Sequence, residues 1–188
     1  MQKKVGFIVY DHFAIWQVSL LQKFLTDADY QIETLSINGG LISTDGGVLV
    51  HTESLKYKNP NQYEFLLLPG GRMSEELVDN LFLQQFLQAF NGLIAASCAS
   101  ATIVAGAGLV KGDFTTMPHI KDIYSEYFAD GHYIDTDMVA SDKLITSKGF
   151  AHYEFTMAVL EKIGLTEKDP RLKSMALKLS RNQTLVSK

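Results

Sequence analysis

Three short, almost wholly apolar runs constrain the fold of this chain more than any other feature. They are Lys4–Tyr10, Tyr63–Leu68 and Leu93–Ala96. Strands that are apolar on both faces belong to parallel sheets that helices cover on each side. We therefore expect these runs to form buried parallel strands, with a further strand at Tyr30–Ile37 and hairpins within Leu41–Thr52 and Met138–Ser147.

Amphipathic segments lie between the predicted strands. Residues 14–26 predict one helix, and Leu83, Phe86, Leu87 and Phe90 share the face of a second. Further helices are predicted near residues 120–127 and 155–163, and another after Asp169-Pro170. The alternation of strands and helices predicts a doubly wound α/β fold with a mostly parallel sheet and helices on both faces.

Composition limits the class of protein. A chain of 188 residues with 46% hydrophobic residues fits a single domain over residues 1–188. The net charge of −4, without a basic patch, argues against nucleic-acid partners. No apolar segment is long enough for a signal peptide or a membrane span, and a single cysteine suits a reducing cytoplasm. We expect no cofactor and no metal, since no residues have metal-ligand spacing.

The single cysteine, Cys98, stands directly after a predicted strand and before a predicted helix. The residues two positions away on either side, Ala96 and Ser100, are small, as a nucleophile elbow requires. A thiol at a helix N-terminus is favoured as the thiolate. The alternative is a buried structural cysteine, since free cysteine is among the residues most often buried.

A second predicted strand ends in Pro-Gly-Gly-Arg, and parallel neighbours would bring this turn to the same edge of the sheet as Cys98. The backbone N–H groups of Gly71 and Ala99 could then form an oxyanion hole beside the sulfur. Gly70 and Arg72 are candidate substrate-binding residues, with Arg72 suited to an anionic group. The alternatives are an ordinary turn and a solvated arginine.

Four segments together resemble the ThiJ/PfpI superfamily, in its intracellular protease/amidase branch. They are Phe-Ala-Ile-Trp-Gln at 13–17, Leu-Leu-Leu-Pro-Gly-Gly at 66–71, Ile-Ala-Ala-Ser-Cys-Ala-Ser at 94–100, and Thr-Ser-Lys-Gly at 146–149. The resemblance implies a flavodoxin-like fold of the class I glutamine amidotransferase type, a reactive cysteine and a homodimer. The dimer would form through the first helix, whose residues Trp16, Leu20 and Phe24 make a second apolar stripe.

The sequence departs from that family at two positions. The family usually has a Glu or Asp on the first helix, and Gln17 stands there in this chain. An amide can donate a hydrogen bond to sulfur but cannot act as a general base. The family also often has a histidine where residues 113–118 contain none, which leaves His119 as the candidate base. His12 could reach the same edge, and both histidines also fit exposed polar positions.

Three functions follow from these residues. The first is a cysteine-dependent hydrolase, amidase or protease-like enzyme acting on a small carbonyl, amide or peptide substrate, with Cys98, Gln17 and His119 in the catalytic site. The second is a redox or stress sensor in which Cys98 is oxidised. The third is a non-catalytic binding protein in which Cys98 is vestigial.

Overall fold

The sheet predicted from the apolar runs is present. In the computed structural model, which describes residues 2–181 and 183–184, eight strands have the order β3-β4-β2-β1-β5-β6-β10-β9. The six inner strands are parallel, and the two edge strands are antiparallel to their neighbours. The strands are β1 (Lys4–Ile8), β2 (Gln31–Ser36), β3 (Gly40–Ser43), β4 (Leu49–Ser54), β5 (Phe65–Leu68), β6 (Leu93–Ser97), β9 (Met138–Ala140) and β10 (Leu144–Ser147).

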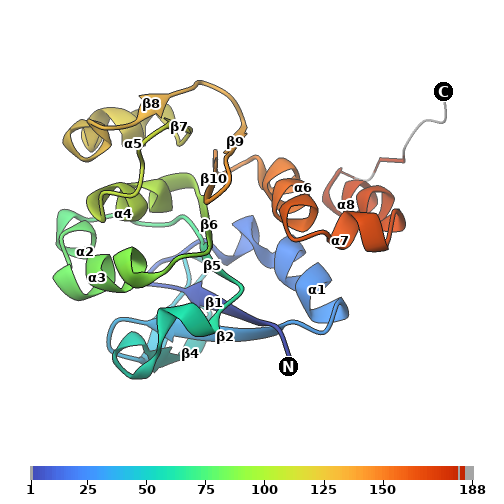
Figure 1. Cartoon of the computed structure of the whole chain (residues 1–188), viewed down its shortest axis with the longest axis horizontal. Coiled ribbons are helices and arrows are strands. Elements are labelled where there is room, and N and C mark those ends of the chain that lie inside the picture. The colour runs from blue at the N-terminus through green and yellow to red at the C-terminus, as the bar shows by residue number, and fades with distance from the viewer. Residues whose placement is uncertain (1, 182, 185–188) are drawn as a thin grey trace.

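Helices cover both faces of this sheet, which completes the predicted doubly wound fold (Figure 1). One layer contains α1 (Ser19–Asp27), α6 (His152–Lys162), α7 (Leu165–Lys168) and α8 (Arg171–Arg181). The other contains α2 (Glu75–Val78), α3 (Leu81–Ala89), α4 (Ala101–Gly106) and α5 (Pro118–Ile123). A small parallel pair, β7 (Asp113–Phe114) and β8 (His132–Tyr133), was not anticipated from the sequence, because strands of two residues leave no periodic signal.

The central strands are buried because every side chain on them faces a helical layer. All four residues of β5, Phe65–Leu68, are fully buried, and β1 and β6 flank it on either side. Burying each large apolar side chain contributes about 1.5–3 kcal/mol. The three strand ends that carry Gly70, Cys98 and the segment after β1 consequently lie side by side at one edge of the sheet.

The second apolar stripe of the first helix is covered partly within the chain. The segment begins as a 3₁₀ turn, Ile15–Gln17, and continues as α1. Phe24 on this stripe is buried, and α1 contacts both α6 and α8. Trp16 is the exception, with 50% of its surface exposed. Helix α8 therefore covers part of this stripe. Of the three side chains on it, Trp16 is the one that is largely exposed to solvent.

Candidate active site

Cys98 occupies a sharp turn between β6 and α4. Its φ of 56° is in the left-handed region, which costs a non-glycine residue about 1–3 kcal/mol and is held only where the surroundings enforce it. The hydroxyl of the buried Ser100 donates to the carbonyls of Ser97 (2.7 Å) and Leu68 (2.9 Å). The Thr116 hydroxyl donates to the Cys98 carbonyl at 2.7 Å. The sharp turn predicted at Cys98 is therefore present, and hydrogen bonds from Ser100 and Thr116 stabilise it.

Two glycines press closely against the cysteine. A Cβ at Gly70 would lie 2.5 Å from both the Cβ of Cys98 and the Oε1 of Gln17. A Cβ at Gly149 would lie 3.0 Å from the Cys98 sulfur and 2.7 Å from the Nε2 of Gln17. The contact with the Cys98 Cβ requires glycine at position 70, whereas a side chain at position 149 would displace the sulfur or the end of the Gln17 side chain. Gly149 was noted only as part of a motif, and the structure adds it to the site.

The hydrogen bonds of Gln17 fix the orientation of its amide. The backbone N–H of Gly70 donates to Oε1 at 2.9 Å, and the Ser97 hydroxyl donates to the same atom at 3.2 Å. The Ser147 hydroxyl lies 3.2 Å from the Ser97 hydroxyl, which continues this buried chain. A backbone N–H can only donate, so the atom that it meets must be the amide oxygen. Nε2 of Gln17 is thereby left to donate toward the sulfur of Cys98.

The sulfur of Cys98 is largely buried. The pKa of its thiol is raised, whereas a position at a helix N-terminus predicts a lowered pKa. Burial raises the pKa of the Cys98 thiol, and the Gln17 side chain and the backbone N–H groups of Ala99 and Gly149 lower it by less. Desolvation disfavours the charged thiolate, and here it exceeds the effect of three donors. The helix that follows is short, since the chain passes through a 3₁₀ turn before the six residues of α4. The thiol is therefore the favoured form at neutral pH.

Most of the candidate residues meet in one cavity of about 280 Å³ at the carboxyl edge of the sheet. Cys98, Gln17, Gly71 and Arg72 line it. The backbone N–H of Gly71 has no carbonyl acceptor in the described part of the chain. Ala99 is buried, and its N–H is directed to the sulfur.

The histidine at this cavity is His12 and not the predicted candidate. His119 is exposed in the first turn of α5 and does not line the cavity. His12 has a φ of 62° and lines the cavity where the chain leaves β1. The hairpin between β3 and β4 also reaches the site, because Asp45 accepts a hydrogen bond from the indole of Trp16 at 2.9 Å. Sequence reasoning missed Trp16 and Asp45 as site residues, since a contact between helix and hairpin has no local pattern.

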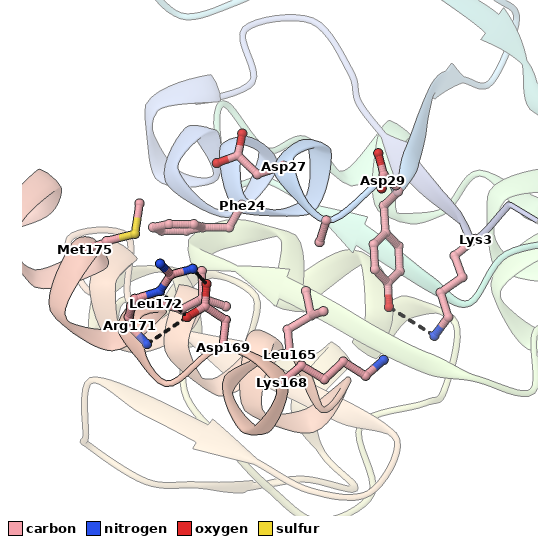
Figure 2. A pocket seen from close by; sticks show the side chains of 12 residues that line it. Lys3, Phe24, Asp27, Asp29, Leu165, Lys168, Asp169, Arg171, Leu172 and Met175 are labelled. Carbon is pink, nitrogen blue, oxygen red and sulfur yellow. Dashed lines mark hydrogen bonds and ion pairs between the residues drawn. The ribbon is translucent and has the colours of Figure 1, made fainter.

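A larger cavity, of about 650 Å³, lies between α1, α7 and α8 (Figure 2). Lys3 and Tyr30, which line it, stand just before β1 and β2, so this cavity is at the amino edge of the sheet, opposite Cys98. Two of its cationic side chains have partners within the cavity. Lys3 donates a hydrogen bond to the Tyr30 hydroxyl, and the Arg171 guanidinium donates two hydrogen bonds to the Asp169 carboxylate. Cys98 is therefore not among the residues that line this cavity.

Two further structural findings concern metals and membranes. In residues 2–181 and 183–184, no three His, Cys, Asp or Glu side chains gather as a metal site would require. Over the same residues, none of the helices combines the length and the apolar character needed to cross a bilayer.

The fold and the site together define a flavodoxin-like α/β protein with a cysteine at a strand–helix elbow. Residues 3–162 match the model of the DJ-1/PfpI family, and the chain belongs to this family. This finding confirms the resemblance stated from the sequence motifs.

Several relatives are similar over most of the chain. The "Uncharacterized protease YdeA" of Bacillus subtilis is 29% identical over 168 residues, which are 86% of this chain and 83% of that protein. Protein dj-1beta of Drosophila melanogaster is 32% identical over 156 residues, 77% of this chain and 80% of the relative. "Glutathione-independent glyoxalase DJR-1.2" of Caenorhabditis elegans is 29% identical over 127 residues, 65% of this chain and 67% of that protein.

Solved structures agree with the fold. The crystal structure of Drosophila melanogaster DJ-1beta superposes with a TM-score of 0.81 at 24% identity, over 94% of this chain and 98% of that one. The Schizosaccharomyces pombe DJ-1 structure has a TM-score of 0.76 at 21% identity, over 90% and 96% of the two chains. At these identities the likeness establishes the architecture alone.

The raised thiol pKa predicts slow alkylation at neutral pH. Iodoacetamide should label Cys98 more slowly at pH 7 than it labels a free cysteine, with the rate rising to a midpoint above the ordinary thiol pKa, because only the thiolate reacts. Each unit by which the pKa is raised lowers the thiolate fraction about tenfold. In Gln17→Met the midpoint should move higher still, since a donor that lowers the pKa is lost.

Gln22→Met, on the same helical segment, is the matched control and should leave the labelling profile unchanged. A midpoint below that of free cysteine, or one that Gln17→Met leaves in place, would contradict this account of the thiol.

Proposed function

We propose that this protein is a cysteine-dependent enzyme acting on a small carbonyl or amide compound. The observation that carries the proposal is that Cys98 and Gly71, whose backbone N–H has no carbonyl acceptor among the described residues, line one cavity. The names of relatives support it, since one is called a protease and another a glutathione-independent glyoxalase.

The geometry suggests how the bond-forming step proceeds. The Cys98 thiolate attacks the carbonyl carbon, and the π electrons move to the oxygen. That oxygen acquires negative charge beside the N–H group of Gly71, where a preorganised donor stabilises it more than water does; the N–H of Ala99 remains directed to the sulfur. Gln17 holds the sulfur in place through Nε2.

The step that this site performs poorly is proton transfer. Gln17 stands where the family usually has an acid, its oxygen already accepts two hydrogen bonds, and an amide takes up no proton. His12 lines the cavity, but it makes no hydrogen bond to Cys98 in the described part of the chain, so water removes the thiol proton in this proposal. Turnover limited by this step is slow at neutral pH and increases as the pH approaches the raised pKa of the thiol.

Substitution Gln17→Glu tests the proposal by supplying a base of the same shape. We expect kcat/KM toward glyoxal to rise at least about tenfold, because a positioned general base contributes on the order of 10²-fold or more. The measurement is steady-state turnover from pH 6 to 9, with Cys98→Ser as the inactive control. No turnover of glyoxal or of a small amide by either wild type or Gln17→Glu would refute the enzymatic function.

Oxidation of Cys98 is a second candidate function, favoured by the donors around the sulfur. Nε2 of Gln17 and the N–H of Ala99 are directed toward it, and the N–H of Gly149, which donates to the Met117 sulfur at 3.4 Å, lies close enough to lower the pKa of the thiol as well. A sulfinate has two oxygens that accept hydrogen bonds. The Gln17 amide does not ionise, so it can donate to the sulfinate at any pH. The same arrangement would therefore stabilise an oxidised cysteine in a stress-sensing protein.

Mass spectrometry after mild peroxide treatment tests this second function. Wild-type protein should accumulate the sulfinate of Cys98, whereas Gln17→Met should proceed to the sulfonate or remain unoxidised, because a donor to the sulfinate oxygen is missing. Gln22→Met should behave as the wild type does. Equal product distributions in all three proteins would argue against a built sulfinate site.

We also propose a homodimer, acting in a reducing cytoplasm, that buries the surface around Trp16. The adjoining β3–β4 hairpin exposes Leu41, Val48 and Leu49, and Trp16 is tied to it through Asp45. Several exposed apolar side chains on one hairpin are typical of an interaction surface. The dimer would therefore bring a second copy beside the entrance to the Cys98 cavity.

Light scattering after size exclusion at micromolar concentration should give twice the chain mass for the wild type. Leu49→Asp should shift the population toward monomer, since it places a charge in the apolar patch. Leu81→Asp, an exposed leucine on α3 in the other helical layer, should leave the mass unchanged. A monomeric wild type would rule out this assembly at that concentration.

A further inference from the structure

A second cavity of about 430 Å³ adjoins the one that contains Cys98. The segments that follow β1 and β2 form it, together with the start of α2. His12 and Arg72 line both cavities, so they stand at the junction between the two. A ligand that reacts at Cys98 can therefore extend past Arg72 into the larger space.

Much of the wall of this second cavity is apolar. Ile37 and Ile42 line one part, Leu77 lines another, and the mostly buried Val9 and Tyr10 belong to it as well. Its volume falls within the range of small-molecule pockets, which are lined mainly by apolar groups with a few polar anchors. It suits an apolar group of about the size of a phenyl ring.

Arg72 is the polar anchor, and its exposed side chain has no ion-pair partner among the described residues. Over the described ranges, 2–181 and 183–184, no carboxylate forms an ion pair with it. The acids at the two cavities have other donors: Asp11 accepts from the N–H of Ser43, and Asp45 accepts from Trp16. The backbone N–H of Arg72 donates to the His12 carbonyl at 3.2 Å, which fixes where the side chain starts.

We propose that the substrate is a 2-oxo acid with an apolar side chain. Its keto carbon lies at Cys98, its carboxylate pairs with the Arg72 guanidinium, and its side chain fills the cavity beside Ile37 and Leu77. Guanidinium and carboxylate match in charge and in two-pronged geometry. A neutral aldehyde or amide would use Cys98 but leave Arg72 and the apolar cavity empty.

The covalent step of this inference rests on the proposed function, whereas the recognition step does not. The sulfur of the Cys98 thiolate bonds to the keto carbon, and the C=O π pair moves to the oxygen, which then takes a proton from water. The product is a hemithioketal, and no oxidant or reductant is needed. Recognition of the carboxylate and the side chain needs no reaction at Cys98 at all.

Calorimetric titration with phenylpyruvate tests recognition separately from chemistry when it is done in a Cys98→Ser background. Phenylpyruvate should bind, and adding Arg72→Gln should weaken binding at least tenfold because the charged pair is lost. Arg171→Gln, a surface arginine at the start of α8, is the matched control and should have no effect. Leu77→Trp and, separately, Ile42→Trp should weaken phenylpyruvate more than glyoxylate, which lacks the side chain.

The outcomes separate this inference from the proposed function. If Arg72→Gln leaves phenylpyruvate affinity unchanged, or if no binding occurs, the 2-oxo acid assignment is overturned even where glyoxal is turned over. If neither tryptophan variant discriminates between the two acids, the assignment of the apolar cavity is overturned. Binding with the expected losses supports the assignment even if no turnover is found.

Discussion

The hydrogen bond from the Gly70 N–H to the oxygen of Gln17 is the contact on which the site depends. It ties the turn after β5 to the first helical segment and decides which end of the amide meets the sulfur. Reversing the amide would place two donors against each other and leave the Ser97 hydroxyl without its acceptor. Hydrogen-bond donors therefore lie around the sulfur. They would stabilise a negative charge on a ligand or on an oxidised cysteine, but the Gln17 amide cannot accept the thiol proton.

Burial and hydrogen bonding oppose each other at Cys98. The close packing that holds the elbow in its left-handed conformation also removes water from the sulfur, which raises the pKa of the thiol. Three donors reduce this effect without cancelling it. A cysteine can therefore have the backbone turn of a nucleophile elbow while burial keeps its thiol mostly protonated. The backbone geometry of such a cysteine does not by itself determine its reactivity.

Sequence patterns were sufficient for the sheet, the elbow and the family, because each depends on local spacing. The apolar runs predicted β1, β5 and β6, and the small residues around Cys98 predicted its turn. Patterns could not show that α8 covers part of α1, or that Trp16 meets Asp45, since these contacts join distant segments. The raised pKa of the Cys98 thiol could not be predicted from the sequence either, because it depends on how deeply the sulfur is buried.

The glycines at positions 70 and 149 have a consequence for any compound that reaches the sulfur. They close in on Cys98 from different parts of the chain, so the sulfur is open chiefly toward the cavity. A flat carbonyl whose oxygen points at the Gly71 amide then presents one of its two faces to the thiolate. In the proposed binding mode a carboxylate held by Arg72 would decide which face this is, so addition at the sulfur would give the new carbon centre a single handedness.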